Sequence, residues 1–138
     1  MVGCSDDEVR IDPQIKLLFE TLTCHPEYRL GRKNEIIGEW QLVSYQRHEI
    51  EEEPNDFSCD HIVYLFSSDQ KVIISSNIDY EWTGVYDYVY HVSNNCPLCL
   101  PNANFKLGDS RWYCEITEST MRLVDSENGV TKYLIRKR

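Results

Sequence analysis

The chain has 138 residues, 41% of them hydrophobic and 12% aromatic, which is typical of one folded domain with a single core. Its formal net charge of -9 would repel phosphate backbones and anionic lipid, so we expect no nucleic-acid partner. No apolar run approaches the roughly 18 residues of a membrane-spanning helix, which excludes the common class of helical membrane proteins.

Residues 1–10 form an acidic leader that contains one cysteine. Gly3-Cys4 resembles the end of a bacterial lipobox, and Ser5-Asp6-Asp7-Glu8 resembles the stretch after the lipidated cysteine of Bacteroidetes-type lipoproteins. The resemblance implies a flexible tether, a lipid anchor at Cys4 as the one membrane attachment, and an outer-membrane lipoprotein of the cell envelope, periplasmic or surface-exposed. The alternative is an ordinary disordered terminus with an incidental cysteine.

Residues 11–34 are expected to form a helical segment and a connector. Asp12 is a suitable N-cap, and Pro13 suits the first helical position. Apolar residues then follow at helical spacing, and Pro26 ends the pattern. We expect this helix to cover one open end of the sheet that follows. Its apolar stripe consists of Ile15, Leu18, Phe19 and Leu22.

Residues 35–138 break into eight short β-type runs separated by turn residues. Such a series predicts an all-β fold, an eight-stranded antiparallel up-and-down barrel, because closing the meander removes its two exposed edges. An orthogonal sandwich is the alternative. The predicted strands are 36–46, 61–66, 71–76, 80–92, 103–107, 111–116, 120–125 and 131–136.

The alternation of residues in two strands predicts which side chains share a face. In the first strand, Trp40, Leu42 and Ser44 fall on one face, with Val43 and Tyr45 on the other. In the fourth, the even-numbered residues from Trp82 to Val92 fall on one face and the odd-numbered residues from Val85 to His91 on the other. We expect Trp40 to plug one end of the barrel.

Several short motifs, in this order, resemble those of small bacterial lipocalin-like envelope proteins. The resemblance covers residues 36–138 and implies a non-enzymatic lipocalin-like barrel with a small hydrophobic ligand in its mouth. We also expect a monomer without a cofactor. The motifs are Gly38-Glu39-Trp40 in the first strand, Tyr64-Leu65-Phe66 in the second, Gly84-Val85-Tyr86 in the fourth, and Met121-Arg122-Leu123 with Tyr133-Leu134-Ile135-Arg136 in the closing hairpin.

The candidate ligand-binding residues are Trp40, Trp82, Tyr86 and Tyr88, because aromatic rings with polar tips suit a pocket wall. The alternative is that these rings only fill the core, since an eight-stranded barrel has room for little else. Asp87 and His91 share a face, but four residues along a strand place them about 13 Å apart, too far for a catalytic pair. We therefore expect no catalytic residues, and we interpret the acidic run from Glu49 to Asp56 as a solvated loop.

Six cysteines are many for a small domain: in an oxidising compartment they can form disulfides, whereas in a reducing one they would need a metal or catalytic role. Strand order places the candidates Cys24, Cys96, Cys99 and Cys114 at one end of the barrel and Cys59 at the other. Cys59 is therefore predicted to be unpaired, with Cys24 linking helix and barrel. The competing interpretation is a zinc site formed by Cys96-x-x-Cys99 with Cys24 and His25. A single Cys-x-x-Cys motif without a second matched pair is weak evidence for zinc, so we expect no metal.

Two functions remain open from the sequence. The first is an envelope lipoprotein that binds a small hydrophobic molecule in its barrel. The second is a structural or protein-interaction module with a filled barrel, no ligand pocket and a protein partner. An interior space of a few hundred Å³ would favour the first, and a packed interior beside an exposed apolar patch would favour the second.

Overall fold

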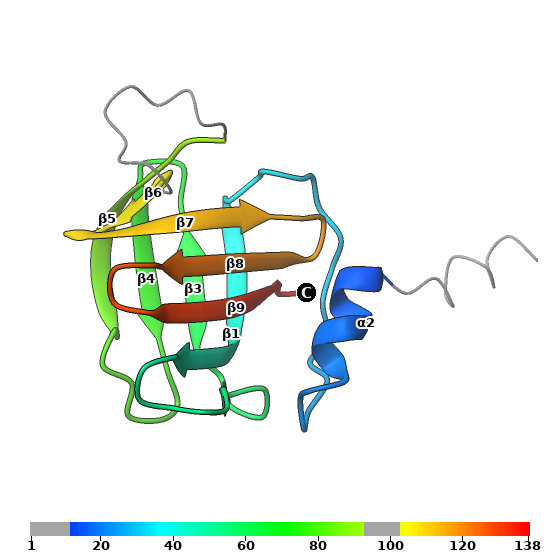
Figure 1. Ribbon diagram of the computed structural model, residues 1–138. Helices are drawn as coiled ribbons and strands as arrows, with labels where there is room; N and C mark the ends of the chain where they lie inside the picture. Colours follow the sequence, from blue (N-terminus) through cyan, green and yellow to red (C-terminus); the bar gives the residue numbers. More distant parts are fainter. Residues whose placement is uncertain (1–11, 93–102) are drawn as a thin grey trace, which may run out of the picture.

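A computed structural model describes residues 12–92 and 103–138 and places them in one antiparallel β-barrel with a short helix beside it (Figure 1). The helix α2 covers Pro13–Phe19. The strands are β1 (Gly38–Arg47), β2 (Asn55–Asp56), β3 (Val63–Phe66), β4 (Lys71–Ser75), β5 (Gly84–Tyr90), β6 (Phe105–Leu107), β7 (Ser110–Ile116), β8 (Thr120–Asp125) and β9 (Val130–Arg136).

The sheet closes because β1 pairs with both β3 and β9. The strands from β3 to β9 follow one another as neighbours, so eight strands form a closed up-and-down barrel, as the turn spacing predicted. The acidic loop adds a feature that the sequence did not predict, the two-residue strand β2, which pairs with β1 through Ser44 and Tyr45. Tight turns join most neighbours, and Gly108 and Gly129 adopt the positive φ of 57° and 64° that such turns require.

A β-bulge in β1 changes which of its side chains face inward. Opposite β9, Leu42 pairs with Leu134 and Ser44 with Tyr133, so Val43 is the extra residue. After the bulge Tyr45 joins Trp40 and Leu42 in the interior, while Val43 packs outside. The predicted face of Tyr45 was therefore wrong, because strict alternation fails wherever one strand carries an extra residue.

Helix α2 lies against the outer wall of the barrel, not over an end as expected. Asp12 caps it by accepting a hydrogen bond from the backbone N–H of Gln14, with Pro13 at the first position. Ile15 and Leu22 pack against Val43 of β1 and Ile135 of β9. Within residues 12–92 and 103–138, no helix has the length and apolar character that crossing a membrane would require.

One end of the barrel is filled by Trp40 and Arg136, and we call it the closed end. The guanidinium of Arg136 lies 4.3 Å from the centre of the Trp40 ring. It also donates hydrogen bonds of 2.9 to 3.1 Å to four backbone carbonyls. Trp40 is thus a buried plug, as predicted. The carbonyls belong to Arg32, Glu35, Thr117 and Glu118.

Candidate ligand site at the open end of the barrel

The opposite end, which we call the open end, is formed by the β4–β5 connection and by the β6–β7 and β8–β9 turns. Its most unusual residue is Lys132, the second inward-facing residue of β9 after Val130. The Lys132 side chain is 0% exposed, so its amine is completely removed from water. Its position opposite Tyr45 of β1 places it just inside this end of the barrel.

The amine of Lys132 is held by two tyrosine hydroxyls. Nζ donates to the Oη atoms of Tyr64 and Tyr80, each at 3.1 Å, and these two hydroxyls are also hydrogen-bonded to each other. No carboxylate lies within ion-pair distance of Lys132 in the parts of the chain that the structure describes. The amine is therefore hydrogen-bonded but its positive charge is not balanced by an anion.

Five aromatic rings surround Nζ of Lys132. The two indoles are nearest, with ring centres 4.4 and 4.9 Å from the nitrogen, and the three phenol rings follow at 5.5 to 5.7 Å. Ring faces attract a cation electrostatically, but they carry no net negative charge that would balance it. The rings belong to Trp82, Trp112, Tyr45, Tyr64 and Tyr80.

Burial dominates the ionisation of this cluster. Desolvation lowers the pKa of Lys132 from its ordinary value of 10.5 to about 7, and the distant carboxylate of Glu81 opposes this only weakly. Desolvation also raises the pKa of Tyr64 and of Tyr80, so both phenols stay protonated. At neutral pH the cluster therefore contains a substantial fraction of neutral amine beside two phenol hydroxyls.

A cavity of about 430 Å³ lies above this cluster. Trp82 and Trp112, which contact the amine from one side, form part of the cavity wall. Tyr45 and Tyr86 supply further aromatic surface. The cavity is thus an aromatic mouth, and two of its lining rings, Trp82 and Trp112, are also the rings nearest to the Lys132 amine.

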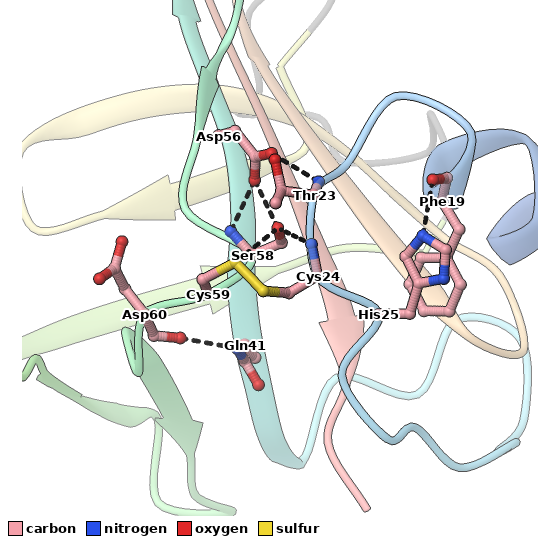
Figure 2. The surroundings of a disulfide bond; sticks show 9 residues. All are labelled: Phe19, Thr23, Cys24, His25, Gln41, Asp56, Ser58, Cys59 and Asp60. Atoms are coloured by element: carbon pink, nitrogen blue, oxygen red, sulfur yellow. Dashed lines mark hydrogen bonds between the residues drawn. A yellow bond between two sulfur atoms is a disulfide. The ribbon is translucent and has the colours of Figure 1, made fainter.

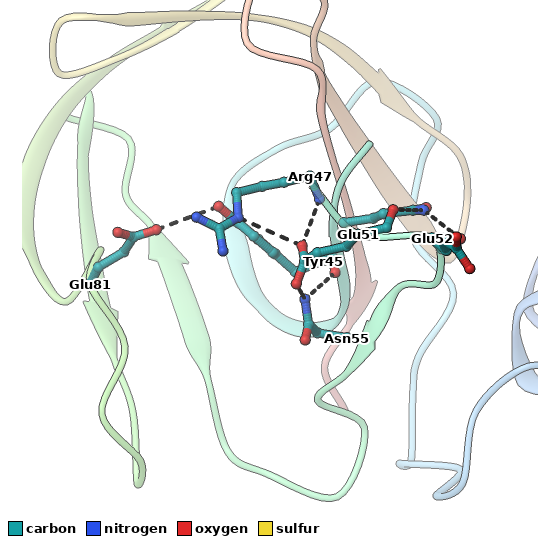
Figure 3. Close-up of polar contacts among 7 residues, drawn as sticks. Tyr45, Arg47, Glu51, Glu52, Asn55 and Glu81 are labelled. Carbon is teal, nitrogen blue, oxygen red and sulfur yellow. Dashed lines mark hydrogen bonds and ion pairs between the residues drawn. The ribbon is translucent and has the colours of Figure 1, made fainter. Parts of the chain in front are cut away.

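Two carboxylates lie at the rim of this cavity, Glu81 and Asp125. Glu81 accepts a hydrogen bond from the hydroxyl of Tyr45 at 3.4 Å, and burial together with this carboxylate raises the pKa of that phenol (Figure 3). Asp125 accepts from the backbone of the β8–β9 turn and from the side chain of Asn128. The mouth is therefore apolar within and negatively charged at its edge, which disfavours an anionic ligand.

A small polar cluster fixes Tyr45 on its outer side (Figure 3). Asn55 donates to the backbone carbonyl of Tyr45 at 3.1 Å and to the carboxylate of Glu51 at 2.7 Å. Glu51 also forms an ion pair with Arg47 at 3.6 Å. The hydrogen bonds of Asn55 explain why the chain returns to β1 as strand β2 within the acidic loop.

The four predicted ligand residues are divided between the two ends. Trp82 and Tyr86 line the mouth cavity. Trp40 belongs to the closed end, and Tyr88 is buried with its hydroxyl donating to the carbonyl of Ser67 in the β3–β4 turn. The predicted alternation of β5 is correct, since Tyr86 and Tyr88 face inward and Val85 faces outward, but a single strand spans the barrel and cannot place all its rings at one mouth.

Sequence reasoning missed Lys132, Trp112 and Tyr45. The signal for Lys132 was present, because it alternates with Val130, Leu134 and Arg136, the inward face of β9. Because a lysine is normally assigned to the solvent face of a strand, the inward position of Lys132 was not predicted. Tyr45 could not have been found by alternation, because the bulge at Val43 turns it inward.

The disulfide prediction was wrong for Cys59, which is bonded to Cys24 (Figure 2). The backbone N–H of Thr23 donates to Asp56 at 2.7 Å, and that of Cys24 donates to Ser58 Oγ at 3.0 Å. Because α2 runs along the outer wall, the segment after it reaches the β2–β3 loop, whereas the prediction assumed that Cys24 lay where β1 begins. Cys24 does link the helical segment to the barrel, as expected.

The same contacts shift the ionisation of Asp56. Burial raises the pKa of its carboxyl, but hydrogen bonds from Ser58 and Thr23 outweigh burial and lower the pKa to about 2. Asp56 is therefore a charged acceptor that joins the segment after α2 to the β2–β3 loop.

The remaining cysteines give no second disulfide in the described residues. Cys114 is free and buried in the core, so its place among the disulfide candidates was wrong. It lies on the inward face of β7, and burial raises the pKa of its thiol. Cys4, Cys96 and Cys99 lie outside the described residues, and within the described ranges no group of His, Cys, Asp and Glu side chains is arranged to hold a metal ion.

Comparison of the chain with protein-family models, with curated proteins and with solved structures finds no match.

Proposed function

We propose that this protein is a non-enzymatic, lipocalin-like lipoprotein of the bacterial envelope that binds a small hydrophobic molecule at the open end of its barrel. The observation that carries the proposal is the aromatic cavity of about 430 Å³ at this end. Small-molecule pockets are typically about 300–1,000 Å³ and are lined mainly by apolar and aromatic groups with a few polar ones.

The interior limits the depth of binding. Lys132, Tyr64 and Phe66 are all 0% exposed and occupy the space that a deep calyx would need. The ligand therefore sits in the mouth against Trp82 and Tyr86, and it is a small molecule without a long chain. The carboxylates at the rim favour an uncharged ligand over an anionic one.

The neutral fluorescent probe N-phenyl-1-naphthylamine tests this assignment. We expect its fluorescence to rise on binding to the wild-type protein and the dissociation constant to increase about ten-fold in Tyr86→Ala, a loss of about 1.4 kcal/mol. Tyr90→Ala is the matched control, because Tyr90 is also a half-buried tyrosine on the inner face of β5 but lies toward the closed end. Absence of probe binding, or an equal loss in both variants, would contradict the proposal.

The lipid anchor at Cys4 has a separate test. We expect mass spectrometry of the mature protein from native membranes to find a diacylglyceryl group on Cys4 at the new N-terminus. A mature protein with an unmodified Cys4 would remove the membrane attachment from the proposal and leave ligand binding unaffected.

One observation favours the second candidate function, docking of a protein partner. Leu65, Ile73 and Val85 are paired across β3, β4 and β5 and are 39%, 48% and 66% exposed, forming an apolar row on the outer wall. A photo-crosslinking residue at Ile73 would form a discrete adduct in an envelope extract if this row docks a partner. The same residue at Lys106, an exposed position of β6, is the control.

A further inference from the structure

Binding of an apolar molecule in the mouth gives no role to the buried amine beneath it. Nζ of Lys132 lies 4.4 Å from the Trp82 ring centre and 4.9 Å from that of Trp112, and both rings also line the cavity. A lysine in a core normally has a carboxylate partner, yet the described residues hold none within ion-pair distance of this one. Its hydrogen-bond partners are two phenols.

This environment suits a nucleophilic amine. A lysine that is desolvated in an apolar pocket loses its proton more easily, and the free amine is the form that attacks a carbonyl carbon. The charged groups that face the cluster are few. Glu81 lies on the β4–β5 connection and Asp125 at the end of β8. Arg47 of β1, which is paired with Glu51, acts on the Tyr45 phenol from the outer edge. The side chains that β1, β3 and β7 place against the amine, Tyr45, Tyr64 and Trp112, are neutral.

We propose that Lys132 captures a small neutral aldehyde as a reversible imine, a covalent step that rests on the proposed binding of such a molecule in the mouth. The amine lone pair forms a bond to the carbonyl carbon, the carbonyl π pair moves to oxygen, and a proton passes from nitrogen to that oxygen. The nitrogen lone pair then forms the C=N bond as the C–O bond breaks. The second proton on nitrogen leaves with the oxygen, so amine and aldehyde give imine and one water, with no oxidant or reductant.

The two phenols are placed to move these protons. The hydroxyls of Tyr64 and Tyr80 are each 3.1 Å from Nζ and are bonded to each other, so one can donate to the departing oxygen while the pair takes up the proton from nitrogen. They contact the reacting nitrogen directly and act as proton-transfer groups. The hydrophobic surroundings also protect the imine, because they limit the water that would hydrolyse it.

Trp82 is the group that must move to admit the aldehyde. It belongs to the β4–β5 connection, outside the strands, and is half-buried, whereas Trp112 lies within β7 and is fully buried. Displacement of one indole from a connection disturbs no strand pairing. In this proposal, displacement of the Trp82 ring, 4.4 Å from Nζ, gives the aldehyde access to the amine.

Trapping with benzaldehyde and sodium cyanoborohydride at pH 7 tests the proposal on the intact protein. We expect one benzyl group per chain, mapped by peptide mass spectrometry to Lys132, at least ten-fold faster than modification of the exposed Lys106. The rate at Lys132 should reach half its maximum near pH 7, whereas ordinary exposed lysines react faster up to about pH 10. Trp82→Ala should accelerate the labelling and Lys132→Arg should abolish the fast adduct.

The controls separate this inference from the proposed function. 4-Carboxybenzaldehyde should label Lys132 more slowly than benzaldehyde, because the rim carries Glu81 and Asp125. Labelling of exposed lysines alone, or labelling of Lys132 only in urea, would overturn the imine proposal. If N-phenyl-1-naphthylamine still binds in that case, ligand binding at the mouth stands without covalent capture; if neither occurs, both fail.

Discussion

Replacement of Lys132 by Met removes one ionisable group from the core at nearly constant side-chain length, and it should change how stability depends on pH. The pKa of Lys132 is about 7 in the folded protein, against an ordinary 10.5 in the unfolded chain. Since the folded pKa is the lower one, the unfolded state binds more protons between these two values. The contribution of Lys132 to the free energy of unfolding should therefore be lowest below pH 7 and rise as the pH increases toward 10.

The size of the effect follows from the titration itself. Each pH unit over which the unfolded state holds one additional proton contributes about 1.4 kcal/mol. Integrated from pH 6.5 to pH 9 for a folded pKa near 7, the wild-type protein gains about 2–3 kcal/mol relative to Lys132→Met. Histidines and carboxylates titrate in both proteins, so their effects cancel in the difference.

Urea unfolding at a series of pH values measures this difference directly. Lys106→Met is the control, because Lys106 is exposed on β6 and its removal should give a difference that does not vary with pH over this range. If the difference between wild type and Lys132→Met were constant from pH 6.5 to 9, Lys132 would not lose its proton there. Such a constant difference would show that desolvation does not lower the pKa of Lys132 in the folded protein, whatever the absolute stability of the variant.

Three further predictions concern the rest of the fold. Replacing Cys24 and Cys59 together by Ser should lower the free energy of unfolding by about 3–4 kcal/mol in urea, because the bond closes a loop of sequence separation 35; no change would show that the crosslink adds nothing. Gly31→Ala should lower the free energy of unfolding by about 2–4 kcal/mol, and with it the melting temperature. The added Cβ would lie 2.6 Å from Cζ of Arg136 and would displace the guanidinium from the carbonyls that it binds. An unchanged melting temperature would contradict this. Asp56 has a pKa of about 2 in the folded protein against an ordinary 3.8, so its contribution to the free energy of unfolding is present above pH 4 and is lost as the pH falls toward 2. The stability of Asp56→Asn should therefore fall less steeply with acid than that of the wild-type protein. Identical acid titrations of the two proteins would argue against this role.

The sequence by itself determined the barrel. Alternation along β5 reports directly on which of its side chains face inward, and the turn residues between strands report on where each strand ends. Both are local properties of the chain, so they can be read from the sequence without knowing the tertiary contacts. The same holds for the Asp12 cap and Pro13 at the start of α2, which depend only on residues a few positions apart.

The tertiary structure decided everything that joins distant segments. The pairing of Cys24 with Cys59 depends on the path of α2 along the outer wall, and nothing near either cysteine encodes that path. The open end is another such case. Lys132 acquires its character only where β9 meets β1, with the bulge at Val43 turning Tyr45 toward it and the β4–β5 connection placing Trp82 over its amine. The Lys132 amine is removed from water and surrounded by aromatic rings only after the strands have closed into a barrel.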